Sequence, residues 1–370
     1  MINGANMNSK QVYMDNAAST MPSEAVKQKI IETLQIYGNP SSQHDEGFKA
    51  KSIINESSQI ISEKLNCEPE ELYYTSGATM SNNLIIQGFL RKYPNGKILY
   101  SAIEHNDITM MADYFGKRKF IKIPVLHNGL IDITFLAKQL KRYRRVPVLC
   151  TIQAANSECG TVQLVQDLSK LVHAYPKTYL HSDVTQYIAH FECDVEKLGL
   201  DALSMSGQKI NCIKGIGLLY ISNNLSISPI IFGEQGLIGG TENVLGIACL
   251  GEAFRTLSYD YANLKFKRNY FIEKIDAPLV GSFNSRLPNN IYVISTKDAE
   301  SMVVYLNEFG ICASAGSACS SNDVDPSHVV LAMGYSEEEA KSCVRFTINN
   351  QTSYEDIDYV VDIFNRLNKV

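Results

Sequence analysis

The stretch LSMSGQKINCIKGIGLLYIS, residues 203–222, holds two apolar runs with Lys209 in the polar segment between them. The first run predicts a buried strand that ends at Ser206-Gly207, and the turn at residues 215–217 leads into a second strand. A lysine just past a buried strand lies where α/β sheets bind ligands, outside the carboxyl ends of the strands. Partial loss of water there would make its amine reactive, but this stretch alone favours an ordinary surface lysine in a turn.

Short apolar runs alternate with helical patterns from about residue 25 to 250. The runs that predict strands are ELYYTS (71–76), KILYSA (97–102), FIKIPV (120–125), PVLCTI (147–152), TYLHSD (178–183), ALSMSG (202–207) and GLLYIS (217–222). Several are apolar on both faces, as strands buried between two helix layers are. We therefore expect an α/β fold with a mostly parallel sheet, in a large domain over residues 25–255.

The pattern changes beyond about residue 255. NIYVIS (290–295) and CVRFTI (343–348) predict strands, and residues 299–309 predict a helix. A last helix has apolar residues on one face, and Thr352-x-x-Glu355 predicts a capping box ahead of it. We expect a smaller α+β domain that combines residues 1–24 with residues 256–370.

Composition excludes several functions. The chain has 370 residues with a formal net charge of −5, which argues against direct nucleic-acid binding through bulk charge. It has no apolar run of about 18 residues that could span a membrane, and its first residues have no apolar core of the signal-peptide kind. The nine cysteines are scattered without close ligand spacing, and most of them lie in apolar surroundings. This pattern predicts reduced thiols, no metal site and a cytoplasmic protein.

Two further strand ends carry polar residues that suit one cofactor. LHSDVTQ (180–186) ends a strand at Asp183, 26 residues before Lys209, and a carboxylate there could hold the pyridine nitrogen of pyridoxal phosphate protonated. YYTSGATMSNN (73–83) predicts a strand followed by a helix whose first N–H groups, near Ala78 and Thr79, could hold a phosphate. Taken alone, helix capping explains both segments equally well.

The run ASAGSACSSND (313–323) surrounds Cys319 with small residues and has neither helical nor strand periodicity. It predicts a solvent-facing loop. By itself it indicates an exposed free cysteine in a linker.

Ten motifs, in order over residues 12–368, together resemble the cysteine desulfurases, which are pyridoxal-phosphate enzymes of aminotransferase class V with fold type I. The motifs are YMDNAAST (13–20), YGNPSSQH (37–44), TSGAT (75–79), IEHND (103–107), ANSECG (155–160), SDVTQ (182–186), SGQK (206–209), GGTEN (239–243), SAGSACSS (314–321) and VRFT (344–347). The GSAC loop resembles that of the long-loop, group I enzymes.

This resemblance implies a role for each matching residue. Lys209 would hold the cofactor covalently and move the Cα proton of the substrate. Cys319 would attack the sulfur of L-cysteine, which gives a persulfide and L-alanine. His105 would stack on the pyridine ring and move protons, while Asp183 would contact the ring nitrogen and Gln186 the ring hydroxyl.

The resemblance also implies the phosphate and substrate contacts. The residues of this chain that would contact the cofactor phosphate are Ala78, Thr79, Ser206 and Gln208. Thr241 would reach the phosphate of the other subunit, which implies a homodimer. Arg345 would bind the substrate carboxylate. Either Asn156 or Ser157 takes the position of the family asparagine near the ring, and the sequence leaves this open.

Three departures from the family pattern bear on cofactor affinity and substrate range. Gln208 stands in place of a histidine, Ile238 in place of an arginine, and Met80 in place of an acidic residue. The expected partner is a sulfur-acceptor or scaffold protein, with iron–sulfur cluster assembly as one destination of the sulfur. The alternatives are another class V activity, such as a lyase or an aminotransferase, and a degenerate scaffold that binds the cofactor without turnover.

Overall fold

A computed structural model of the chain describes residues 10–233, 236–316 and 326–369. The strands are β1 (Val12–Tyr13), β2 (Leu72–Thr75), β3 (Lys97–Ser101), β4 (Phe120–Ile123), β5 (Val148–Thr151), β6 (Thr178–Asp183), β7 (Ala202–Ser206), β8 (Gly217–Ile221), β9 (Asn290–Ile294), β10 (Ile311–Cys312), β11 (Ser314–Ala315) and β12 (Cys343–Thr347). The α-helices are α1 (Glu24–Thr33), α2 (Asp45–Leu65), α3 (Ala78–Lys92), α4 (Asn106–Phe115), α5 (Ile133–Tyr143), α6 (Val165–His173), α7 (Val195–Leu198), α8 (Val244–Arg255), α9 (Tyr261–Lys274), α10 (Ala299–Glu308), α11 (His328–Ala332), α12 (Glu337–Lys341) and α13 (Tyr354–Lys369). Two short 3₁₀ helices, η1 (Pro69–Glu71) and η2 (Gly207–Lys209), precede β2 and follow β7.

The larger sheet has seven strands in the order β2-β8-β7-β6-β5-β3-β4. Neighbouring strands from β7 to β4 are parallel, and β8 runs antiparallel to both of its neighbours. The expectation of a mostly parallel α/β sheet is therefore confirmed. Because these strands are parallel, the segments that follow β3, β5, β6 and β7 leave the sheet at the same edge.

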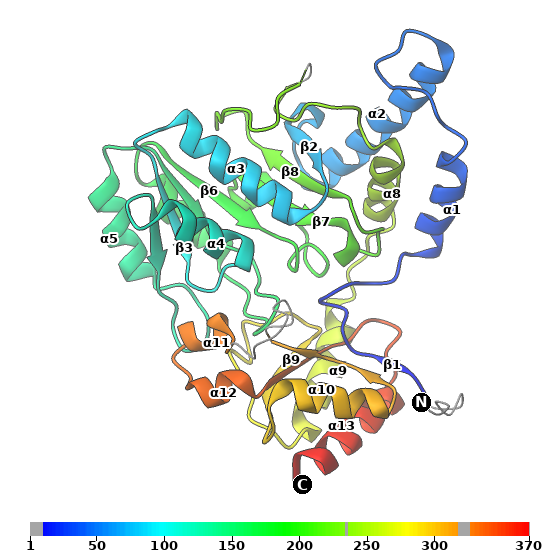
Figure 1. The fold of residues 1–370 in the computed structure, drawn as a ribbon, viewed down its shortest axis with the longest axis vertical. Coiled ribbons are helices and arrows are strands. Elements are labelled where there is room, and N and C mark those ends of the chain that lie inside the picture. The colour runs from blue at the N-terminus through cyan, green and yellow to red at the C-terminus, as the bar shows by residue number, and fades with distance from the viewer. Residues whose placement is uncertain (1–9, 234–235, 317–325, 370) are drawn as a thin grey trace.

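Helices cover both faces of this sheet, as Figure 1 shows with α3 and α4 in front of the strands. One apolar cluster joins α3 and α4 to the sheet, and a second joins α1, α2, α5, α6 and α8 to the opposite face. Strand β5 explains how both faces become apolar, because Leu149 packs into the first cluster while Val148 and Cys150 pack into the second. The sheet is thus buried between two helix layers.

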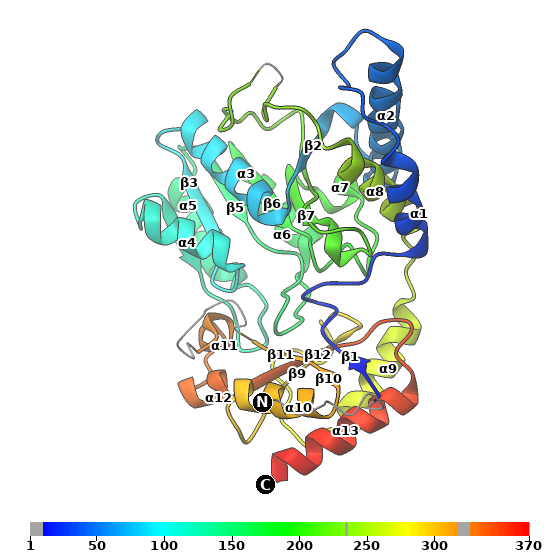
Figure 2. The ribbon, with the colours of Figure 1, turned by 45° about the vertical axis from the view of Figure 1, so that its right-hand side comes forward.

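A smaller unit lies below the strand ends in Figures 1 and 2. Its three-stranded antiparallel sheet has the order β11-β12-β9, and its apolar core includes residues of α9, α10 and α13. The N-terminal strand β1 joins this unit by pairing in parallel with β10, so that Val12 lies opposite Ile311. This pairing supports the proposed division into a domain of residues 25–255 and a domain of residues 1–24 plus 256–370.

Two local expectations are wrong. Ser314 and Ala315 form strand β11 and pair with Arg345 and Val344, so the start of the small-residue run is not a loop. The cap of α13 lies one residue later than expected, because Ser353 and Asp356 exchange side-chain and backbone hydrogen bonds at 3.0 Å. In the described part of the chain, none of the helices combines the length and apolar character that a membrane span requires.

Candidate active site

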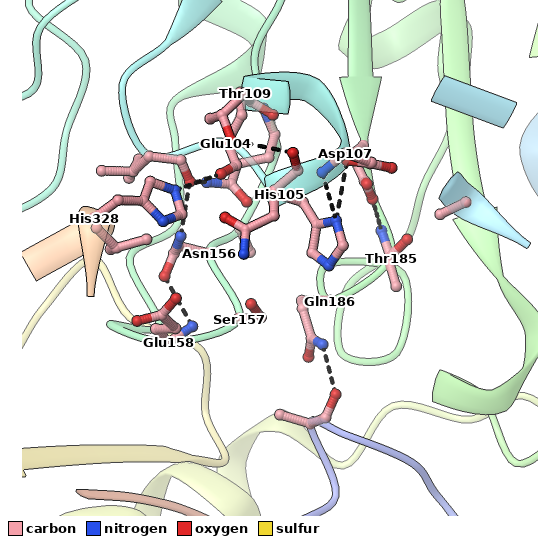
Figure 3. Close-up of a pocket in the computed structure, with 18 of the residues that line it drawn as sticks. Glu104, His105, Asp107, Thr109, Asn156, Ser157, Glu158, Thr185, Gln186 and His328 are labelled. Carbon is pink, nitrogen blue, oxygen red and sulfur yellow. Dashed lines mark hydrogen bonds and ion pairs between the residues drawn. The ribbon is translucent and has the colours of Figure 1, made fainter. Parts of the chain in front are cut away.

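A cavity of about 880 Å³ opens where the strand ends of the large sheet meet the smaller unit. Eleven of the residues singled out from the sequence line it, and they are Ala78, Thr79, His105, Asn156, Ser157, Asp183, Gln186, Ser206, Gln208, Lys209 and Arg345. Thr241 is exposed and does not line this cavity. Cys319 lies outside the described residues. Figure 3 shows side chains from several elements pointing into one common space.

Lys209 reaches this cavity because it closes η2, the short turn directly after β7. Its Nζ donates a hydrogen bond to the backbone carbonyl of Ala18, in the segment that connects β1 to α1. Beside it, Ser206 Oγ accepts a hydrogen bond from the N–H of Ala78 at 2.7 Å, at the first residue of α3. Gly77 precedes that helix with φ of 153°. The lysine and the helix N-terminus therefore lie on one side of the cavity.

Asp183 and Gln186 follow the neighbouring strand β6. Asp183 Oδ1 accepts from the N–H of Thr185 at 2.9 Å, and Oδ2 accepts from Asn82 Nδ2 at 3.0 Å. Gln186 Nε2 donates to the carbonyl of Ala17 at 3.0 Å, in the same connecting segment that contacts Lys209. Both side chains are thus fixed by bonds to neighbouring elements and still line the cavity.

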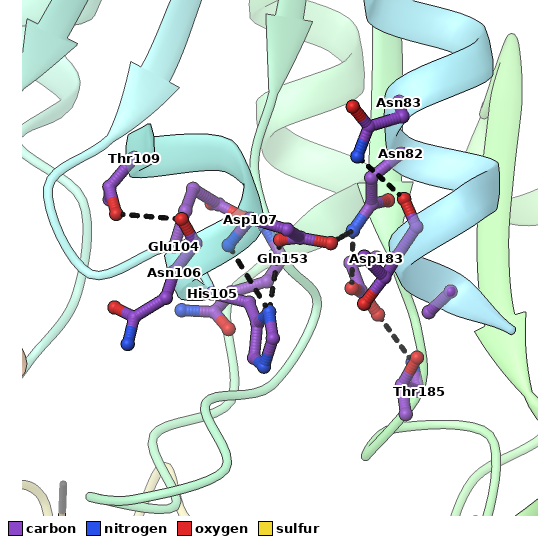
Figure 4. Close-up of polar contacts among 12 residues, drawn as sticks. Asn82, Asn83, Glu104, His105, Asn106, Asp107, Thr109, Gln153, Asp183 and Thr185 are labelled. Atoms are coloured by element: carbon purple, nitrogen blue, oxygen red, sulfur yellow. Dashed lines mark hydrogen bonds and ion pairs between the residues drawn. The ribbon is translucent and has the colours of Figure 1, made fainter. Parts of the chain in front are cut away.

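His105 stands at the N-terminal end of α4, in the connection after β3. Its Nδ1 lies 3.0 Å from Asp107 Oδ1, and Figure 4 shows the ring below that carboxylate. The hydrogen bond to Asp107 raises the pKa of His105, against the lowering effect of burial. Half of the imidazole side chain, 52%, is exposed. The Nδ1 edge of the ring is therefore held by Asp107, and about half of the side chain stays accessible.

Arg345 enters from β12 of the smaller unit. Its Nη1 donates to the carbonyl of Ser157 at 3.0 Å, and its Nη2 pairs with Asp15 Oδ1 at 3.0 Å.

The side chain of Asn156 bonds to the backbone of three residues. Its Oδ1 accepts from the N–H groups of Glu158 and Cys159, and its Nδ2 donates to the carbonyl of Ile103. Asn156 and Ser157 both line the cavity, and Asn156 keeps one amide N–H for a ligand.

Sequence reasoning missed two buried carboxyl groups of the cavity. Burial raises the pKa of Glu104 well above its ordinary value. One carboxyl oxygen accepts from the N–H of Gln153, and the other is buried with no hydrogen-bond partner among the residues that the structure describes. Burial also raises the pKa of Glu158, whose Oε2 accepts from Ser327 Oγ at 2.5 Å and from Tyr292 Oη at 3.2 Å. The motifs IEHND and ANSECG contain both residues, but nothing in their composition indicates burial.

Comparison with known proteins agrees with this architecture. The family model for aminotransferase class V matches residues 12–360. The cysteine desulfurase IscS 1 of Archaeoglobus fulgidus is 36% identical over 95% of this chain and 95% of the relative. A NifS-like protein of Rickettsia africae has a TM-score of 0.88 at 30% identity, over 98% of this chain and all of that one. SspA, solved in complex with cysteine, has a TM-score of 0.80 at 30% identity, over 91% of this chain and 98% of that one.

The mostly parallel sheet, with a lysine, a histidine and a carboxylate gathered at its strand ends, is the architecture of an α/β enzyme, and that edge is the candidate active site. The chain belongs to the aminotransferase class V family, and within that family it belongs to the cysteine desulfurases. The identity extends over nearly the whole chain, so it includes both sheets and the segments between them.

Proposed function

We propose that this chain removes the sulfur atom of L-cysteine, releases L-alanine and carries the sulfur as a persulfide on Cys319. The observation that carries this proposal is the convergence of Lys209, His105, Asp183 and Arg345 on one cavity. A neighbour in structure was solved with cysteine bound, which supports L-cysteine as the substrate. The role of Cys319 rests on its place in the SAGSACSS motif.

We propose pyridoxal phosphate as the cofactor, because the cavity offers a chemically suitable partner to each of its polar groups. Lys209 supplies a primary amine, Asp183 a carboxylate for the ring nitrogen, and the N-terminus of α3 with Ser206 a set of donors for the phosphate. Within the described residues, Asn82 Oδ1 is buried beside Asp183 without a hydrogen-bond partner, which is consistent with a site completed by a ligand. Bound there, the cofactor would accept electrons from the substrate α-carbon.

Side chains of the chain would bind the substrate, move protons and attack the sulfur. Arg345 would bind the substrate carboxylate, and Lys209 and His105 would move protons. The Cys319 thiolate would attack the substrate sulfur, so that an S–S bond forms while the substrate C–S bond breaks. The carbon keeps the electron pair of that bond and takes up a proton. L-cysteine and one thiol thereby give L-alanine and one persulfide, and no further reactant is needed.

We also propose a homodimer in which Thr241 completes the cavity of the partner subunit. Thr241 is exposed and does not line the cavity of its own chain. On α4, Met110 and Tyr114 leave 69% and 85% of their surface uncovered. Sedimentation equilibrium gives the mass of the assembly directly, and a monomer at micromolar concentration would contradict the dimer.

The eight cysteines that the structure describes are free thiols, which supports a reducing, cytoplasmic location. We propose that the sulfur is transferred there to an acceptor protein.

The test is the amount of L-alanine formed from L-cysteine under reductant by the cofactor-loaded protein, measured beside Cys319→Ser and Lys209→Ala. We expect alanine from the unsubstituted protein and none above background from either variant. Equal turnover by the Cys319 variant would contradict the persulfide mechanism and favour another class V reaction. Absence of turnover in all three, with cofactor bound to the unsubstituted protein, would favour the scaffold alternative.

A further inference from the structure

The carboxylate of Asp107 fixes the orientation of the cavity histidine. Asp107 Oδ1 lies 3.0 Å from His105 Nδ1, and the Asp107 side chain is only 6% exposed. The backbone N–H of Asp107 lies 3.5 Å from the same ring nitrogen, which is a longer and weaker contact. A neutral imidazole nitrogen cannot donate and accept at once, and a carboxylate is the stronger partner. The proton of the neutral ring is therefore on Nδ1, and Nε2 keeps its lone pair.

A second bond prevents the carboxylate from turning away. Asn82 is completely buried in α3, and its Nδ2 donates to Asp107 Oδ2 and to Asp183 Oδ2, both at 3.0 Å. Figure 4 shows this amide between the two carboxylates, with His105 at the far end. The chain His105–Asp107–Asn82–Asp183 thus connects the residue proposed to cover the cofactor ring with the residue proposed to contact its nitrogen.

Charged groups from three sides face the imidazole. Asp107 on α4 and Asp183 at the end of β6 favour the protonated ring, while Lys209 in η2 disfavours it. Glu104, the residue before His105, also carries a carboxyl group, and burial raises the pKa of that group well above its ordinary value. Among these groups, Asp107 has the largest effect on the pKa of His105, through its hydrogen bond to the ring.

We propose that Asp107 is a positioning residue of this active site. It holds His105 as the Nδ1–H tautomer, with Nε2 as the atom that accepts a proton in the cavity. A proton taken up at Nε2 leaves an imidazolium ion whose charge Asp107 balances at hydrogen-bond distance. The tautomer follows from the described geometry alone, whereas its use in turnover rests on the proposed function.

The experiment follows the ring nitrogens of His105 by ¹⁵N NMR in cofactor-free protein labelled at histidine, with His105→Gln to assign the signals. The test variant is Asp107→Asn, which keeps the shape of the side chain and removes its charge. Asp201→Asn is the matched control, because Asp201 pairs with His173 Nε2 at 2.8 Å and does not line the cavity. The pH profile of kcat/KM for alanine formation is measured on the same proteins.

We expect the unsubstituted protein to carry the neutral-ring proton on Nδ1 of His105. In Asp107→Asn the titration of His105 should move to lower pH, and kcat/KM at neutral pH should fall about tenfold or more, a part of the hundredfold or larger contribution of a positioned acid or base. Asp201→Asn should move His173 and leave His105 unchanged.

Two results would overturn the proposal. One is a proton on Nε2 of His105 in the unsubstituted protein. This measurement does not depend on the folding of any variant. The other is a His105 titration that is the same in Asp107→Asn as without the substitution. If instead His105 responds as expected while the unsubstituted, cofactor-loaded protein forms no alanine, the positioning role stands and the proposed function fails.

Discussion

Replacing Arg345 by lysine should weaken L-cysteine binding selectively, because lysine keeps the charge and removes the planar fork. Nη1 already donates to the Ser157 carbonyl and Nη2 to Asp15 Oδ1, each at 3.0 Å. One ammonium group cannot serve both partners and a substrate carboxylate in this fixed geometry. Loss of one hydrogen bond to a charged partner costs about 1.5–3 kcal/mol. This corresponds to a dissociation constant for L-cysteine about 10 to 150 times higher.

Absorbance titration of the cofactor-loaded protein measures this effect with two amines. L-cysteine has the carboxylate that Arg345 is proposed to bind, and cysteamine lacks it. Arg345→Lys should weaken L-cysteine and leave cysteamine nearly unchanged. The matched control is Arg286→Lys, since Arg286 is also buried but donates to Ser282, Val280 and Asn290, which do not line the cavity.

Equal weakening of both amines by Arg345→Lys would refute this reasoning, because it would show a general distortion of the cavity. An unchanged L-cysteine affinity would refute it as well, since the carboxylate would then be bound elsewhere. Arg286→Lys should lower the thermal midpoint and keep the ratio of the two affinities. A change in that ratio in the control would make the ratio useless as a measure of carboxylate binding.

Two further predictions concern stability. Ser327→Ala removes the 2.5 Å hydrogen bond to buried Glu158 and should lower the free energy of unfolding by about 1–3 kcal/mol in urea titration; a change below about 0.5 kcal/mol would contradict it. Burial lowers the pKa of His181 to about 3, and its nitrogens lie within 2.9 Å of Thr151 Oγ1 and Ser204 Oγ. Below about pH 6.5 the unfolded chain binds a proton there that the folded chain does not, so stability should fall with falling pH, by about 2 kcal/mol at pH 5. His181→Asn should make the urea midpoint less dependent on pH between 7 and 5, and an equal slope would count against His181.

The sequence predicts the large sheet well because each of its strands carries its own local signal. The expected runs at 178–183 and 217–222 match β6 and β8 to within a residue, since the second is apolar and the first ends at the polar pair Ser182-Asp183. The two-residue strands β1 and β10 were missed. They pair Val12 with Ile311, and no local period can reveal a contact between segments so far apart in the chain.

In the site, too, local sequence signals predict some residues, whereas contacts between distant segments remain hidden. Lys209 and Asp183 follow adjacent parallel strands, so their positions in the chain already bring them to one edge of the sheet. The bond that holds the Asp107 carboxylate in place joins it to Asn82, on a different helix and 25 residues away. Sequence spacing contains no information on that contact, because it depends on how α3 and α4 pack.

The acidic side chains near the cavity differ in burial and hydrogen bonding, which the sequence does not reveal. The formal charge of the chain counts Glu104 and Glu158 as negative, yet burial raises the pKa of both. Near His105, the carboxyl groups of Asp107 and Asp183 raise the pKa of the ring, and one buried amide of Asn82 bonds to both. A composition count cannot distinguish Glu104 and Glu158, whose pKa burial raises, from Asp107 and Asp183, which bond to a buried amide. Burial and hydrogen bonding thus decide how each acid affects the site, and only the folded chain determines both.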